Sequence, residues 1–230
     1  MKKIGLLGGM SWESTALYYR AINEEVALRL GGLHSAELLI DSLDFAPMEQ
    51  LQVAGDWDAA GADLARRAVG LQAAGADLLV LATNTMHLVA PAIEAAVDIP
   101  LLHIADPTGT DLVASGHHRV GLLATRFTME QDFYRDRLTQ NFGLDVVVPD
   151  ADDREIVHRI IYDELCMGIV RDESRERYRE VIARLVDAGV DAIIFGCTEI
   201  TMLVGPEDSA VPTFDTTALH ALGAVETALA

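Results

Sequence analysis

An internal repeat constrains the fold of this 230-residue chain more than any other feature of its sequence. Three pairs of apolar segments follow one another in the same order at nearly constant offsets of 116 (119 − 3), 114 (189 − 75) and 112 (211 − 99): residues 3–9 with 119–125, 75–85 with 189–199, and 99–103 with 211–215. In the second pair Thr83 falls opposite Cys197. The chain therefore consists of two related halves of about 115 residues, each of ordinary domain size.

The repeated segments are typical of buried strands in a parallel sheet, since residues 192–195 are four apolar residues in a row. Helical patterns separate these runs, the longest at residues 11–30 and 56–74. We therefore expect an α/β fold with two pseudo-symmetric lobes, each a parallel sheet flanked by helices, and an active site in the cleft between them. The expected divisions are an N-terminal lobe at 1–116, a C-terminal lobe at 117–215, and a closing helix at 216–230 that packs back on the first lobe.

Composition narrows the class of function. The 36 acidic residues outnumber the 17 Lys and Arg residues and give a net charge of −19, which argues against nucleic acid as a partner. No apolar run approaches the roughly 18 residues needed to cross a membrane, and no signal peptide is visible. Two cysteines suit a reducing compartment better than a disulfide framework. We expect a cytoplasmic protein that acts on a small molecule.

Cys197 follows the apolar run at 192–195, where the chain leaves the sheet. Ligands of open α/β sheets bind at the carboxyl ends of the strands, so a thiol there is a candidate nucleophile or proton carrier. Free cysteine is also a common space-filling residue in protein interiors. The turn at residues 8–11 leads into a helix whose free N–H groups can hold a carboxylate, although its glycines also suit any tight turn. It matches neither the dinucleotide fingerprint nor a P-loop.

Three motifs, in this order and spacing, resemble the aspartate/glutamate racemase family: Gly8-Gly9-Met10-Ser11, Asn84-Thr85-Met86-His87 and Gly196-Cys197-Thr198-Glu199-Ile200. The resemblance covers essentially the whole chain. It implies a two-lobed pseudo-symmetric α/β fold, a homodimer, and racemisation of an amino acid without a cofactor. In typical members each lobe supplies one cysteine, and the two thiols flank the α-carbon of the substrate from opposite faces.

Inversion at carbon requires a base on one face and an acid on the other, each ~3–3.5 Å from the reacting atom. A thiol, with a pKa near ~8.5, is within tuning range of neutral pH. The carbanion also needs oriented hydrogen-bond donors at its carboxylate. The resemblance implies that Cys197 is catalytic and that Asn84, Thr85, Thr125, Thr128 and Thr198 supply these donors. We expect Thr83 to act as the second catalytic residue, and Met10, Gln52 and Glu199 to be further substrate-binding candidates. No Cys/His spacing suggests a metal site.

Thr83 departs from the family pattern, which has a cysteine at this position. A hydroxyl without an adjacent base cannot accept a proton as a thiolate does, although it can donate or relay one. We therefore expect an asymmetric racemase in which Cys197 deprotonates the L-amino acid and Thr83, or a water beside it, reprotonates the other face. Residues 45–52 contain no Arg or Lys to hold a distal carboxylate. Gln52 is either a hydrogen-bonding group for the substrate or an exposed helix residue.

Several alternatives remain open at this point. A single active cysteine also fits a decarboxylase or a cis–trans isomerase of the same superfamily, and a non-catalytic amino-acid-binding protein. Glu199 either assists Cys197, orients the substrate ammonium group, or lies at a helix start for electrostatic reasons. His87 either forms a hydrogen bond near Thr83 or, as is more usual for a histidine at a helix start, lies at the surface or caps the helix. Cys166 is expected in the core, within an apolar helix.

Overall fold

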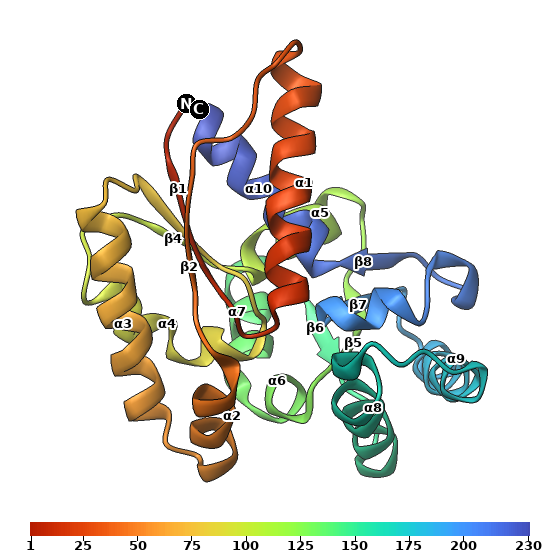
Figure 1. Cartoon of the computed structure of the whole chain (residues 1–230). Coiled ribbons are helices and arrows are strands. Elements are labelled where there is room, and N and C mark those ends of the chain that lie inside the picture. The colour runs from red at the N-terminus through yellow and green to blue at the C-terminus, as the bar shows by residue number, and fades with distance from the viewer. The chain divides into compact units, whose positions relative to one another are not determined.

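The computed structural model describes residues 1–230, which form two compact units. The first unit contains residues 1–104 and 220–230, and the second contains residues 105–219 (Figure 1). Helix α5 (Ala105–Ala114), which precedes the lobe boundary expected at residue 116, belongs to the second unit. The C-terminal helix α10 (Thr216–Leu229) belongs to the first unit from His220 onward.

Each unit contains one four-stranded parallel sheet, and the two sheets have the same topology. In the first unit the strand order is β2-β1-β3-β4, and in the second it is β6-β5-β7-β8. The strands are β1 (Ile4–Gly8), β2 (Leu38–Ser42), β3 (Leu78–Leu81), β4 (Leu101–Leu102), β5 (Arg119–Ala124), β6 (Asp145–Val147), β7 (Ala192–Gly196) and β8 (Thr213–Asp215). This architecture confirms the predicted fold class.

The strand registers reproduce the offsets found in the sequence. Ile4 pairs with Leu78 in the first sheet, and Val120 pairs with Ala192 in the second, which are shifts of 116 and 114 residues. The sequence repeat is therefore also a structural repeat. A residue that follows β3 in the first unit has a counterpart that follows β7 in the second.

Helices connect the strands in each unit. The first unit contains α1 (Trp12–Leu30), α2 (Phe45–Ala54), α3 (Trp57–Ala73), η1 (Thr85–Val89) and α4 (Ala90–Glu94); the second contains α6 (Arg126–Glu130), α7 (Asp132–Phe142), α8 (Ala151–Asp163), η2 (Leu165–Met167), α9 (Asp172–Asp187), η3 (Thr198–Met202) and η4 (Pro206–Asp208). Several helices begin at a side-chain cap; at the start of α1, for example, Ser11 Oγ accepts from Ser14 N at 3.2 Å. None of the helices combines the length and apolar character of a bilayer-crossing segment.

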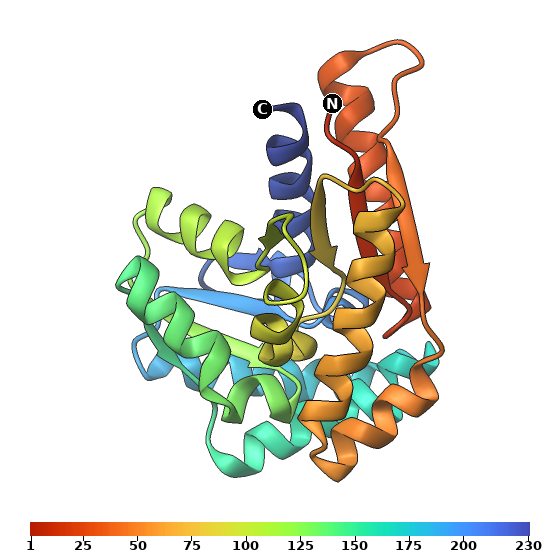
Figure 2. The same ribbon diagram turned by 90° about the vertical axis from the view of Figure 1, so that its left-hand side faces the viewer.

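The sheet of the first unit is buried on both faces, with α1 and α3 on opposite sides (Figures 1 and 2). On one face Leu79 belongs to an apolar cluster that includes Leu64 of α3. On the other face Leu6 clusters with Tyr18 of α1 and Val225 of α10. Burial of each such side chain contributes about 1.5–3 kcal/mol. This two-sided packing leaves the carboxyl ends of the strands, where the connecting loops begin, to carry polar groups.

Candidate functional site

The turn after β1 is built on glycine because its backbone approaches a neighbouring chain segment. Gly9 has a φ of +91°, and a Cβ there would collide with the backbone of Leu43. Its N–H donates to Thr15 Oγ1 at 2.8 Å, which ties the turn to the first residues of α1. Met10, a predicted substrate-binding residue, is buried in this turn.

Thr83, Asn84 and Thr85 follow β3 in the same unit. The Ala82 N–H donates to Leu7 O at 2.8 Å and extends the β1–β3 pairing to the edge of this turn. Thr83 is half-buried, whereas Asn84 and Thr85 are buried where the chain enters η1. The end of β3 therefore presents a hydroxyl, an amide and a second hydroxyl in succession.

Gln52 is buried, and its alternative assignment as an exposed helix residue is wrong. It lies on α2, and its Nε2 donates to Met86 Sδ at 3.0 Å. Helix α2 begins at Phe45 and ends at Ala54. The residue that marks the start of this helix in the sequence is Asp44, an N-cap whose side chain accepts from Ala46 N at 3.3 Å.

The second unit carries a corresponding group of polar residues at the ends of β5 and β7. Thr125 caps α6, and its Oγ1 accepts from Thr128 N at 3.4 Å and lies 3.3 Å from Thr128 Oγ1. Thr198 Oγ1 accepts from Thr217 Oγ1 at 3.3 Å. Because β5 and β7 are neighbouring strands, these hydroxyls follow adjacent strand ends. Thr217 was not predicted, and only its position after β8, a strand of the repeat, could have suggested it.

Cys197 lies at the start of η3, is partly exposed, and contacts a carboxylate. Its Sγ donates to Glu199 Oε2 at 3.0 Å, and Glu199 is buried. Burial raises the pKa of the Cys197 thiol well above its usual value, and the charge of Glu199 raises it further. The free protein therefore holds a protonated thiol whose proton is directed at a carboxylate. This contact supports the assignment of Glu199 as an assistant to Cys197.

Cys166 and Tyr178 both lie near enough to Cys197 to interact with it electrostatically. The position of Cys166 differs from the expected one, and Tyr178 was not predicted. Cys166 is exposed on η2, so its expected place in the core is wrong: α8 ends at Asp163 and the chain turns out at Gly168, where φ is +70°. Tyr178 is fully buried, and its hydroxyl donates to Val157 O at 3.3 Å. Burial raises the pKa of Tyr178, and the Cys197 and Cys166 charges add to this. Tyr178 is therefore a neutral residue near the Cys197 thiol.

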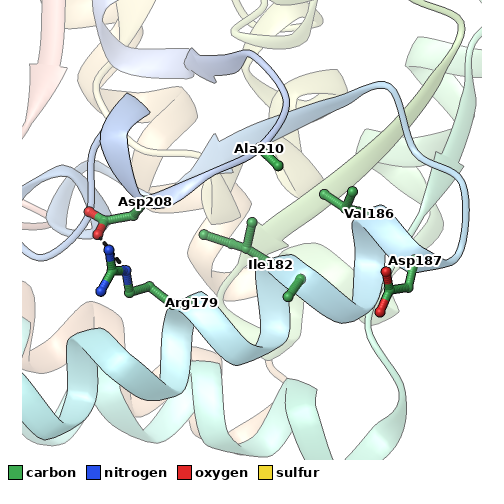
Figure 3. Close-up of a pocket in the computed structure, with 7 residues that line it drawn as sticks. Arg179, Ile182, Val186, Asp187, Asp208 and Ala210 are labelled. Atoms are coloured by element: carbon green, nitrogen blue, oxygen red, sulfur yellow. Dashed lines mark ion pairs between the residues drawn. The ribbon is translucent and has the colours of Figure 1, made fainter.

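A pocket of about 310 Å³ opens elsewhere on the second unit (Figure 3). Its lining comes from α9, η4 and the segment before β8: Arg179, Ile182, Ala183, Val186, Asp187, Asp208 and Ala210. Because the end of α9 leads into the start of β7, this pocket lies toward the amino ends of the strands. It contains none of the predicted site residues and is separate from the Cys197 group.

The structure therefore gathers the predicted residues into two groups, one in each unit. The first unit holds Met10, Gln52, Thr83, Asn84 and Thr85, and the second holds Thr125, Thr128, Cys197, Thr198 and Glu199. Both groups follow the carboxyl ends of parallel strands. No group of three or more His, Cys, Asp or Glu side chains is arranged to hold a metal ion.

The sequence profile described as Asp/Glu/Hydantoin racemase matches residues 7–224, a span that includes both groups. The chain belongs to this racemase family. Among solved structures, a putative Asp/Glu racemase from Yersinia pestis is 56% identical with a TM-score of 0.95, each chain being covered completely. An aspartate racemase homologue from Pyrococcus horikoshii is 34% identical with a TM-score of 0.84, again over 100% of both chains.

Curated members of the racemase family are more distant. A broad specificity amino-acid racemase from Bacillus subtilis is 26% identical over 166 residues, covering 71% of this chain and 70% of the relative. The chain spans about half the length of the curated glutamate racemases it matches, with 47% and 45% of two Shewanella proteins covered. The resemblance seen in the three sequence motifs is thus confirmed at the level of the family.

Proposed function

We propose that this racemase-family protein inverts the α-carbon of L-aspartate, L-glutamate or a related polar amino acid without a cofactor. The observation that carries the proposal is the pair formed by the Cys197 thiol and the Glu199 carboxylate, 3.0 Å apart at the end of β7. Ligand sites of parallel α/β sheets lie at such strand ends. The names of the relatives, which include an aspartate racemase homologue, support the same class of reaction.

In the proposed first step Glu199 accepts the proton of the Cys197 thiol, and the resulting thiolate takes the α-proton of the L-isomer. The substrate ammonium group beside Glu199 would offset the negative charge that raises the thiol pKa in the free protein. The electron pair left on the α-carbon spreads into the substrate carboxylate. Hydroxyl and amide donors of Asn84, Thr85 and Thr125 are proposed to stabilise that charge.

In the proposed second step a proton returns to the opposite face from Thr83 or a water beside it. The cycle closes when solvent returns a proton to that hydroxyl or water and Glu199 releases its proton to solvent. Thr83 occupies the position in the first unit that Cys197 occupies in the second. Its hydroxyl is protonated at neutral pH, so it can donate a proton, but it is a poor acceptor of one. Inversion has an equilibrium constant of 1, so its kcat/KM is the same from either isomer. Exchange of the α-proton with solvent is therefore the step expected to differ, fast from the L-isomer through Cys197 and slow from the D-isomer through Thr83.

Substrate choice is proposed to depend on Gln52 rather than on a cationic side chain. Residues 45–52 carry no Arg or Lys. Gln52 is the polar residue of α2 whose side chain is buried. An amide can hydrogen-bond a carboxylate, a carboxamide or a hydroxyl, since it carries both donors and an acceptor. Neutral polar amino acids therefore belong in the substrate screen beside aspartate and glutamate.

Proton exchange in deuterated water tests the proposal directly. The L- and D-isomers of aspartate, glutamate and several neutral polar amino acids are incubated with the protein, and loss of the α-proton signal is followed by ¹H NMR. We expect rapid exchange from at least one L-isomer and little from its D-isomer. Rapid label uptake from a D-isomer with none from the L-isomer would contradict the proposed direction.

The variant Cys197→Ser separates an enzyme from an amino-acid-binding protein. We expect a loss of turnover of about 10³-fold or more, because a hydroxyl is a far weaker base than a thiolate. Cys166→Ser is the matched control, since it removes the other thiol from an exposed position. A binding protein would show no turnover in any form, and its affinity for the ligand, measured by calorimetry, would survive Cys197→Ser.

A further inference from the structure

We propose that His87 is a positioning residue that fixes the Thr83 backbone, and with it the turn at residues 83–85, through a neutral ring protonated at Nδ1. The proposal deepens the proposed function, because the turn it holds is the one assigned to return the proton. His87 does not itself carry a proton to the substrate. Its effect is to hold the Thr83 hydroxyl and the following donors in one orientation.

The hydrogen bonds of the His87 ring define its tautomer. Nδ1 lies 2.7 Å from Thr83 O, and a carbonyl oxygen only accepts, so Nδ1 carries the hydrogen. The backbone N–H of Ile104 donates to Nε2 at 3.1 Å, so Nε2 carries none. Both ring nitrogens are thus engaged, and the ring is neutral with a single orientation.

These two bonds connect the turn after β3 to the segment after β4. The His87 backbone N–H also donates to Asn84 O at 3.1 Å, so the main chain and the side chain of one residue close the same turn. Strand β3 ends at Leu81, two residues before Thr83. His87 therefore fixes a carbonyl that lies beyond the regular strand pairing.

The packing around His87 prevents its ring from turning. The ring is buried, its centroid lies 4.4 Å from that of His103, and it lies 5.8 Å from that of His220. His220 is fixed as well: its Nε2 donates to Leu102 O at 2.9 Å, which leaves Nδ1 to accept from the Tyr18 hydroxyl at 2.8 Å. A ring held this firmly is suited to positioning a neighbour rather than to exchanging protons.

Two conservative variants separate the two hydrogen bonds. The amide of His87→Asn lies near the Nδ1 position and retains the donor to Thr83 O, whereas that of His87→Gln reaches the Nε2 position and retains the acceptor for Ile104 N. Each variant loses one buried hydrogen bond, so we expect similar losses of unfolding stability in urea. If His87 positions Thr83, His87→Gln should lower kcat for L-isomer turnover about 10- to 100-fold with a smaller change in KM, and His87→Asn should retain most of kcat.

Matched controls and a spectroscopic reading complete the experiment. His34→Asn and His34→Gln make the same substitutions at an exposed turn and should leave turnover unchanged. The ¹⁵N chemical shifts of the labelled wild-type protein should show His87 protonated at Nδ1 and unprotonated at Nε2. Equal loss of kcat in both His87 variants, full activity of His87→Gln, or an Nε2-protonated ring would overturn the positioning role. A wild-type protein with the Nδ1-protonated ring but no turnover of any L-isomer would instead refute the proposed function.

Discussion

The thiol of Cys197 is held in its protonated form by its surroundings. Burial contributes most to its raised pKa, and the carboxylate of Glu199 contributes next. A base that is protonated at rest must lose its proton before it can take one from the substrate. Glu199 has two opposing effects on this step, since its charge raises the pKa of the thiol while its oxygen, 3.0 Å away, is the nearest acceptor for the proton.

The first prediction follows from these opposing effects. For the wild-type protein kcat/KM for the L-isomer should still be rising with pH above the usual thiol range near ~8.5, because the raised pKa of Cys197 delays formation of the thiolate. In Glu199→Gln the negative charge is absent, so the rise should shift to lower pH. The plateau rate should fall because the proton acceptor is lost. Proton-exchange rates measured between pH 6 and 10 check both effects.

The control for this prediction is Glu176→Gln, which removes one negative charge from an exposed position on α9. Its profile should match that of the wild-type protein, since solvent screens an exposed charge. A pH profile that does not move in Glu199→Gln would show that the carboxylate has no influence on the reacting thiol.

The sequence was sufficient to predict which residues follow the strands, but not how deeply each one is buried. Thr83 and Cys197 could be matched because an apolar run precedes each, and the two runs align at one offset. Gln52 and His87 could not be placed, since a single polar residue on a helix has no periodic signal. Their burial depends on packing between α2, η1 and the segment after β4, which are far apart in the chain.

At the scale of elements, strands were more predictable than helix ends. Continuous apolar runs mark the buried strands, and their observed bounds differ from the expected ones by only a few residues. Helices α6 and α7 are separated because Gln131 adopts an extended conformation, with φ −85° and ψ 144°. Neither Gly nor Pro marks that break, so no local signal was present. Helix α8 likewise ends at Asp163, and Cys166, expected within an apolar helix, lies on η2.

An ion-pair cluster joins η4 to α9 in the second unit. The side chain of Asp208 is fully buried and accepts from Arg175, Arg179 and the backbone N–H of Gly205. Burial raises the pKa of Asp208, but the hydrogen bonds from Arg175 and Gly205 outweigh it, and the folded-state pKa is lower than usual. The charged carboxylate therefore stabilises the folded state.

The second prediction concerns Asp208→Asn. Because the arginines are partly exposed and solvent screens them, we expect a loss of about 1–3 kcal/mol in unfolding free energy at pH 7. A depressed folded-state pKa stabilises the fold above the unfolded value near ~3.9, and this contribution is lost as pH falls through the folded value. The difference between variant and wild type in urea unfolding should therefore shrink as pH falls below about 4.

Glu180→Gln serves as the control for Asp208→Asn, because it removes one partner of an exposed ion pair with Arg177 on the same helix. Its cost should be at most a few tenths of a kcal/mol at either pH. An Asp208→Asn variant as stable as Glu180→Gln would mean that the cluster does not hold η4 on α9.

At the scale of the whole molecule, two units of one topology carry different chemistry at equivalent positions. The repeat places Thr83 opposite Cys197, and it also places Thr85 opposite Glu199. The second unit therefore has a thiol with a carboxylate two residues later, whereas the first has a hydroxyl followed by a hydroxyl. The two units therefore differ both in the residue that follows the strand and in the charge two residues later, which in the second unit adds to the raised pKa of the thiol.

The third prediction is that Thr83→Cys confers proton abstraction from D-isomers while L-isomer exchange continues. A thiol at this position can accept a proton, which the hydroxyl cannot. Because Thr85 provides no negative charge two residues later, the pKa of the new thiol lacks the increase that Glu199 causes in Cys197. Exchange from the D-isomer should therefore reach its plateau at lower pH than exchange from the L-isomer, as measured by ¹H NMR in deuterated buffers.

Thr110→Cys adds a thiol at an exposed site and should leave D-isomers unexchanged. If Thr83→Cys leaves the D-isomers equally inert, residue 83 is not the group that faces the α-proton of the D-isomer.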